Sequence, residues 1–203
     1  MMAAYTLTHG CLQEILPQVP QGCPLCAIAC IEGHQDVESC IVISPDSKFF
    51  ASGSYDTSIK LWHADTCEAK YTLQGHEGPV LCLDFIAEGS MLISGSTDKT
   101  VKLWDLNAPT GLRLLRTFSR QSGSICSVKA SPDNKTIATA SYNSPVIIWD
   151  IHTGEQLQTL RDNKLCIRCL IWLDSKLIAS GGADGTISIQ EASHLQILGI
   201  FDC

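Results

Sequence analysis

Four side chains that could bind a metal ion lie close together near the N-terminus. Cys23, Cys26 and Cys30 are followed by His34, so three thiols and one imidazole fall within twelve residues. Zinc accepts such a set tetrahedrally, and ligand spacings of two and three residues are common in zinc sites. The segment from Cys26 to Cys30, however, is an apolar strand-like run in which cysteine packs as a small hydrophobic residue. We keep zinc binding as an alternative and expect no metal and no cofactor.

No combination of nucleophile, base and orienting group indicates an enzyme. The sequence has neither a Gly-x-Ser-x-Gly elbow nor a Gly-x4-Gly-Lys-Ser/Thr phosphate loop. Serine, histidine and aspartate do recur, but at several places along the chain, whereas an active site is built once. We expect no catalytic residues, and the recurrence calls for a structural explanation.

Composition and charge narrow the class of protein. The chain has 203 residues, 45% of them hydrophobic and 17% charged, which suffices for one ordinary domain or two small ones. A net charge of -7 with scattered Lys and Arg argues against direct nucleic-acid binding. No apolar run approaches the roughly 20 residues of a membrane helix, and the start lacks a basic leader. The eleven cysteines are odd in number and often lie in apolar alternating runs, so we expect reduced thiols and a cytoplasmic or nuclear protein.

A repeated phrase organises the chain after about residue 33. Its turn residues, Asp56, Asp98, Asn143 and Asp184, are 42, 45 and 41 residues apart, a period of about forty. Each unit reads as four short strands separated by turns rich in Gly, Ser, Asp and Pro. Sheets of this size cannot bury both faces alone and must stack, as in a β-propeller. In the first unit the strands are expected over residues 38–44, 49–54, 58–63 and 68–73.

Polar side chains recur at fixed places in these units. A histidine before the first strand, a serine in the second, an aspartate in the next turn and a tryptophan in the third can form one chain of hydrogen bonds. We therefore expect stability to fall from the first two units to the last. The sets are His34, Ser52, Asp56 and Trp62, then His76, Ser94, Asp98 and Trp104, then the incomplete Thr139, Asn143 and Trp149, and finally Ser180 and Asp184.

From about residue 33 to 203 the chain resembles the WD40-repeat β-propeller family. Gly33-His34 and Gly75-His76 resemble its Gly-His start, and Trp104-Asp105 and Trp149-Asp150 its closing dipeptide. The turn aspartates match as well. Departures are the histidine after Trp62, the missing Gly-His in the last two units, Asn143 in place of aspartate, and Gln190-Glu191 in place of Trp-Asp.

We expect an all-β WD40-type propeller arc of four full blades plus one orphan outer strand over residues 27–31. Residues 1–26 are expected to be a poorly ordered lead-in, because prolines at 17, 20 and 24 exclude a central strand. Seven blades would need close to 300 residues, and the last unit has its own outer-strand candidate at 195–200. A truncated form of a larger propeller is therefore favoured, while a small closed propeller and an assembling arc stay open. The expected blades cover about 34–74, 75–118, 119–160 and 161–203.

The resemblance implies a noncatalytic scaffold or adaptor that binds proteins or peptides at its turns. The expected contact residues are Tyr55, Thr97 and Tyr142, each directly before a turn residue. The alternative for the two tyrosines is that they cover the edges of neighbouring strands. Asp36 and Glu77 would make this face acidic and favour a basic peptide.

Three alternatives to a general scaffold remain. A substrate receptor of a cullin-type ubiquitin ligase is the first, although the arginine expected two residues after Trp-Asp is replaced by Asn107 and His152. A zinc-binding protein and a nonfunctional fragment are the others. Open blade faces also predict self-association, and we expect neither nucleic-acid nor membrane partners.

Overall fold

The computed structural model describes residue 31 and residues 33–108, 113–142, 144–160, 166–192 and 197–202, the last six by their backbone. These residues form sixteen strands in four antiparallel sheets, with one 3-10 turn at Ala87–Gly89. The strands are β1 (Glu38–Ile43), β2 (Phe49–Ser54), β3 (Ile59–His63), β4 (Ala69–Leu73), β5 (Val80–Ile86), β6 (Met91–Ser96), β7 (Val101–Asp105), β8 (Arg113–Phe118), β9 (Ile125–Ala130), β10 (Thr136–Ser141), β11 (Val146–Asp150), β12 (Gln156–Leu160), β13 (Ile167–Trp172), β14 (Leu177–Gly182), β15 (Thr186–Glu191) and β16 (Ile197–Asp202).

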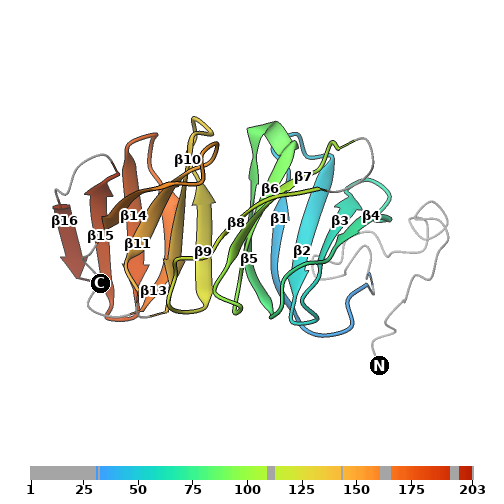
Figure 1. Ribbon diagram of the computed structural model, residues 1–203, viewed down its shortest axis with the longest axis horizontal. Coiled ribbons are helices and arrows are strands. Elements are labelled where there is room, and N and C mark those ends of the chain that lie inside the picture. Colours follow the sequence, from blue (N-terminus) through green and yellow to red (C-terminus); the bar gives the residue numbers. More distant parts are fainter. Residues whose placement is uncertain are drawn as a thin grey trace, which may run out of the picture.

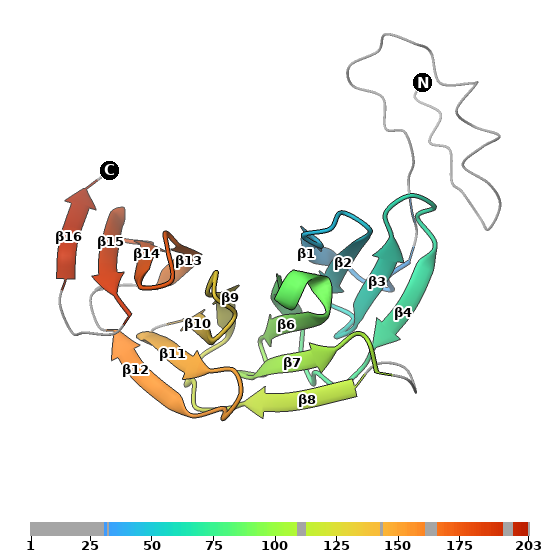
Figure 2. The same ribbon diagram turned by 90° about the horizontal axis from the view of Figure 1, so that it is seen from above.

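Each sheet, called a blade below, consists of four strands paired in chain order. The four blades stand side by side (Figure 1) and follow an arc that is open on one side. Figure 2 shows the first strand of each blade, such as β1 and β9, toward the concave side and the last, such as β8 and β12, along the convex side. The predicted all-β arc of four four-stranded blades is confirmed. The expected lead-in and orphan strand lie outside the described residues, apart from Ile31.

Side-chain hydrogen bonds set the turn between the first two strands of a blade. Ser44 Oγ donates to Asp46 Oδ1 at 2.7 Å and accepts the Phe49 N–H at 3.0 Å. Ser47 can therefore adopt its left-handed conformation, with φ 58°. Blade 3 repeats the bonds with Ser131 and Asp133. Because Ser44 already belongs to this turn, β1 ends one residue before the expected boundary.

The first strand of every blade carries a bulge near its start. In β1, Glu38 pairs with Ser54 and Cys40 with Gly53, so Ser39 is left as the extra residue. The equivalent bulge residues in the following blades are Leu81, Cys126 and Arg168. The residues before the bulges are Glu38, Val80, Ile125 and Ile167.

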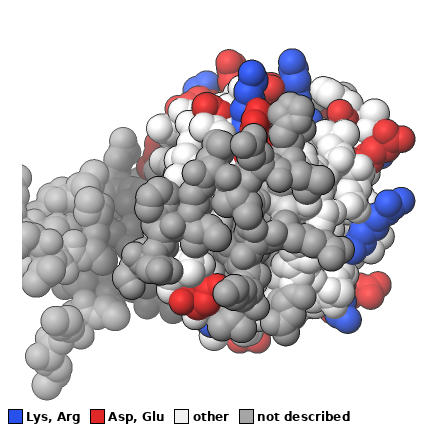
Figure 3. All heavy atoms as spheres, turned by 90° about the vertical axis from the view of Figure 1, so that its left-hand side faces the viewer, with Lys and Arg blue, Asp and Glu red and all other residues white. Residues whose placement is uncertain are grey.

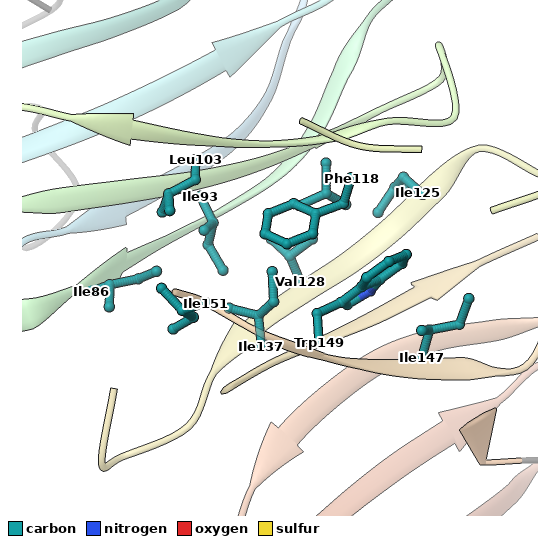
Figure 4. Close-up of a cluster of buried hydrophobic side chains, with 11 residues drawn as sticks. Ile86, Ile93, Leu103, Phe118, Ile125, Val128, Ile137, Ile147, Trp149 and Ile151 are labelled. Atoms are coloured by element: carbon teal, nitrogen blue, oxygen red, sulfur yellow. The ribbon is translucent and has the colours of Figure 1, made fainter. Parts of the chain in front are cut away.

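The hydrophobic core consists of three clusters, each between two neighbouring blades. Figure 4 shows the central cluster, where Phe118 of blade 2 lies beside Trp149 of blade 3. Their ring centroids are 5.3 Å apart in an edge-to-face arrangement. Gly53 and Gly95 bring neighbouring blades close, since a Cβ at either would fall within 3 Å of Val80 or Ile125 of the next blade. Each blade is therefore held mainly by burial against its neighbours.

Candidate functional site

The polar side chains of the first unit form one connected chain of hydrogen bonds. Trp62 Nε1 donates to Ser52 Oγ at 2.9 Å, and Ser52 Oγ lies 2.7 Å from His34 Nε2. His34 Nδ1 lies 3.0 Å from the Asp56 carboxylate, which can only accept. A neutral His34 therefore carries its proton on Nδ1 and accepts the Ser52 hydroxyl at Nε2. A Cβ at Gly33 would lie 2.1 Å from the Trp62 ring, which explains the glycine before the histidine.

The second unit has the same geometry, buried more deeply. His76 lies 2.7 Å from both Asp98 and Ser94, and Trp104 Nε1 donates to Ser94 at 2.9 Å. Burial lowers the pKa of His76 below its usual value, although the Asp98 carboxylate acts in the opposite direction. Burial would raise the pKa of Asp98, but hydrogen bonds from Thr100, His76 and Glu77 hold it below its usual value. The pair is thus a neutral imidazole beside a carboxylate.

In the third unit a glutamine takes the place of the histidine. Gln121 Nε2 donates to Thr139 Oγ1, and Gln121 Oε1 accepts from Ser141 Oγ. Trp149 Nε1 donates to Thr139 Oγ1 at 2.8 Å. Sequence reasoning missed Gln121 because it looked for histidine. The signal was the spacing, since Gln121 precedes Thr139 by the same 18 residues that separate the histidine and serine in the first two units. Asn143 lies outside the described residues.

The fourth unit retains the turn aspartate. Asp184 Oδ1 accepts the Thr186 N–H at 3.1 Å and the Thr186 hydroxyl at 2.7 Å. Ser180 and Gln190 are both buried, with Gln190 at the position of the tryptophan. Asp162, at the position of the histidine, lies outside the described residues.

Of the four metal ligands considered in the sequence, His34 lies in the described part of the chain. Both ring nitrogens of His34 are engaged by Ser52 and Asp56, and the cysteines at 23, 26 and 30 lie outside the description. Within the described residues, no three His, Cys, Asp or Glu side chains are grouped to hold a metal ion. None of the described helices has the length and apolar character needed to cross a membrane.

The expected contact residues lie at one edge of the arc. The backbone N–H groups of Tyr55, Thr97 and Tyr142 donate to carbonyls just before the first strand of their blade, at 2.9, 2.9 and 3.0 Å, so the three positions are equivalent. Tyr55 is 47% exposed and Tyr142 41% exposed, whereas Thr97 is half-buried. Asp36 and Glu77 are exposed near the same turns. Together these five residues are called the turn rim.

A basic side chain that the sequence reasoning overlooked also reaches the turn rim. The guanidinium of Arg168, on β13, lies 5.8 Å from the centre of the Tyr142 ring. Asp36 and Glu77 thus place carboxylates near the turns of blades 1 and 2, where Lys99 is also exposed, and Arg168 places a guanidinium beside Tyr142. No local pattern signals this contact, because it joins different blades.

The sequence pattern of the family described as "WD domain, G-beta repeat" matches residues 26–63, 67–105, 112–150 and 154–189. The chain belongs to the WD40 family. It is similar to the nuclear distribution protein nudF of Emericella nidulans, with 34% identity over 170 residues that cover 82% of this chain and 38% of nudF. It is also similar to the ribosome biogenesis protein WDR12 homolog of Nematostella vectensis, with 34% identity over 157 residues, 76% of this chain and 37% of the relative.

Solved WD40 structures share the fold. The structure of U3-55K superposes with a TM-score of 0.78 at 22% identity, covering 84% of this chain and 53% of that one. The crystal structure of RRP9 WD40 repeats gives the same score and identity, covering 52% of its chain. This WD40 chain thus spans less than two fifths of these curated relatives and about half of these solved chains.

Proposed function

We propose that this WD40 chain is a noncatalytic scaffold that binds a protein segment along the turn rim. The observation that carries the proposal is the pair of exposed tyrosines, Tyr55 and Tyr142, at equivalent positions of a rigid frame. Tyrosine offers a large contact area at low cost in side-chain entropy, and aromatic residues dominate binding hot spots. The family membership supports a binding role, and the hydrogen-bonded serines and histidines serve the frame.

The charges of the turn rim define the partner more closely. Asp36 and Glu77 lie near Tyr55 and Thr97, where they favour a lysine or arginine. Arg168 lies near Tyr142, where it favours an acidic side chain or a terminal carboxylate. The partner we propose is a segment that is basic at one end and acidic at the other. Two relatives are named for nuclear distribution and ribosome biogenesis, which supports a cytoplasmic or nuclear location.

Affinity purification followed by mass spectrometry tests the turn rim. Proteins retained by the wild-type chain should be lost with the double variant Tyr55→Ala/Tyr142→Ala and reduced with Asp36→Lys/Glu77→Lys. Leu157→Ala, an exposed apolar residue on β12, serves as the matched control and should retain the same proteins. Equal retention by the tyrosine variant and the control would show that the turn rim is not the binding surface.

Self-association is a second candidate function, favoured by a separate observation. Large apolar side chains on the first strand of blade 1, among them Ile41 and Ile43, are exposed. Exposed apolar patches of this kind mark surfaces that bind other chains.

A further inference from the structure

The outward face of blade 1 has the residues of a blade interface but faces no blade in the described part of the chain. Ile41, opposite Ser52, is 68% exposed, whereas Leu83, opposite Ser94 in blade 2, is 3% exposed. Ile43 is exposed in the same way, and its counterpart Phe85 is buried against blade 1. We call Glu38, Ile41 and Ile43 the N-terminal end face.

The outward face of blade 4 is open in the complementary way. Ile187, opposite Gly181, is 40% exposed, whereas Ile59, opposite Gly53 in blade 1, is 1% exposed. Ile171 is also exposed. Figure 3 views the molecule from this end, where the described charged side chains lie mostly toward the edge of the view. We call Arg168, Ile171 and Ile187 the C-terminal end face.

At one position the two end faces differ from every internal interface. Glu38 stands where the other blades have Val80, Ile125 and Ile167, all buried against the preceding blade. At two of the three internal interfaces the bulge residue of the preceding blade contacts the backbone of this position, since Ser39 donates to the Val80 carbonyl and Cys126 to the Ile167 carbonyl. At the third, Cys82, the residue after the bulge, donates to the Ile125 carbonyl. The bulge residue of blade 4 is the exposed Arg168.

The repeat geometry therefore brings opposite charges together when one chain follows another. We pack blade 1 of a second copy against blade 4 in the way that blade 2 packs against blade 1. Glu38 of the second copy then takes the place that Val80 has in the internal interface, and it falls beside Arg168. Ile41 and Ile43 then cover Ile187 as Leu83 and Phe85 cover Ile59. Among the described residues Glu38 has no ion-pair partner. Arg168 lies over the exposed Tyr142 ring, from which its long side chain can turn away.

We propose that two copies of this chain associate head to tail, each C-terminal end face receiving the N-terminal end face of the other copy, to close an eight-blade ring. In this ring the two contacts are related by a two-fold axis, and the open side of the arc in Figure 2 faces the second copy. Pairing of like end faces is disfavoured, because each such contact would hold two charges of the same sign and would leave both without the opposite charge. This association uses the end faces and does not depend on a partner at the turn rim.

Charge reversal tests both the association and its direction. Light scattering coupled to size-exclusion chromatography should give the wild-type chain twice its 22.0 kDa mass. E38R alone and R168E alone place like charges at both contacts, so each should run as a folded monomer. An equimolar mixture of E38R and R168E pairs opposite charges at both contacts and should restore the dimer, as should the double variant E38R/R168E.

The controls separate loss of association from loss of folding. Both reversed residues are exposed, so the circular dichroism of E38R and R168E should match that of the wild type. Leu157→Arg, on the convex side of blade 3, should leave the dimer intact. A wild-type monomer at all concentrations, a dimer that persists in R168E, or a series of ever larger open assemblies would each overturn the proposal.

Discussion

In blade 2, hydrogen bonds connect the side chains of His76, Ser94, Asp98 and Trp104 in one series, which serves the structure of the blade. The carboxylate accepts the Nδ1 proton of the imidazole, Nε2 accepts the serine hydroxyl, and the serine oxygen accepts the indole N–H. Each group satisfies another that burial has removed from water. Losing one member therefore leaves a buried polar atom without a partner, which costs more than the net value of one hydrogen bond.

Asp98→Ala should destabilise the protein by about 1 to 3 kcal/mol more than Asp184→Ala. Asp98 accepts hydrogen bonds from Thr100, from the Glu77 backbone and from the buried His76 ring. The sequence of the fourth unit has Asp162 where the second unit has this histidine, so Asp184→Ala cannot deprive a buried imidazole of its acceptor. Urea denaturation of the two variants measures the difference. Equal midpoints would show that the bond to His76 contributes nothing to stability.

His76→Gln should make stability less sensitive to mild acid. The pKa of His76 in the folded protein lies below the value of about 6.5 in the unfolded chain. The contribution of the neutral His76 side chain to the free energy of unfolding is therefore fully present above about pH 6.5, and it is lost as the pH falls toward the pKa of the folded state. Glutamine cannot be protonated in this range, and Gln121 shows that it fits the corresponding place in blade 3.

Thermal melts of the wild type and His76→Gln between about pH 7 and pH 5 check this expectation. Asp98 and Lys102 also act on the His76 ring and are unchanged in the variant, so the comparison isolates the imidazole. Parallel pH profiles would mean that the His76 ring is protonated equally in the folded and unfolded chains.

At the scale of elements, much of the architecture could be predicted because period and turn chemistry are local properties. Ser44 and Asp46 define a turn whatever surrounds them, and alternation defines the strands on either side. Gln121 was missed because residue type was given more weight than spacing. Arg168 was missed because its role depends on the meeting of two blades, and a linear pattern does not contain that information.

Arg116→Ala should loosen the contact between β8 and the turn that precedes β12. The Arg116 guanidinium donates to the carbonyls of His152 and Thr153, both at 2.7 Å, and packs against Gly154. Charge-assisted bonds of this kind contribute about 1.5 to 3 kcal/mol, less where water competes. The ammonium group of Arg116→Lys lacks the two parallel N–H donors of a guanidinium, so the exchange rates of this variant should lie between those of the wild type and of Arg116→Ala. Hydrogen exchange of the β12 amides measures the effect, and unchanged exchange in Arg116→Ala would contradict it.

At the scale of the whole molecule, stability depends on how many neighbours a blade has. Blades 2 and 3 are covered on both sides, whereas blades 1 and 4 have one described neighbour each. In stacked repeats the free energy of unfolding is approximately a sum of unit and interface contributions. The polar sets imply that stability declines from the first unit to the last. In addition, the two middle blades should be more stable than the two end blades, because they have more neighbours.

Native-state hydrogen exchange should show slower exchange for amides of β6 and β10 than for those of β2 and β14. The difference should shrink as protein concentration rises, because association covers the end faces. The monomeric variant E38R should keep the full difference at all concentrations. Uniform protection across the four blades of E38R would indicate a single cooperative unit instead.

The four tryptophans give the arc a natural set of reporters. The sequence contains four, and Trp62, Trp104, Trp149 and Trp172 place one buried indole in each blade. The first three donate within their own blade, whereas Trp172 donates to the Lys129 carbonyl across the boundary between blades 3 and 4. Variants that keep a single tryptophan and replace the others by phenylalanine would therefore report the unfolding of one blade each by fluorescence. The variant that keeps Trp172 would report the separation of blades 3 and 4.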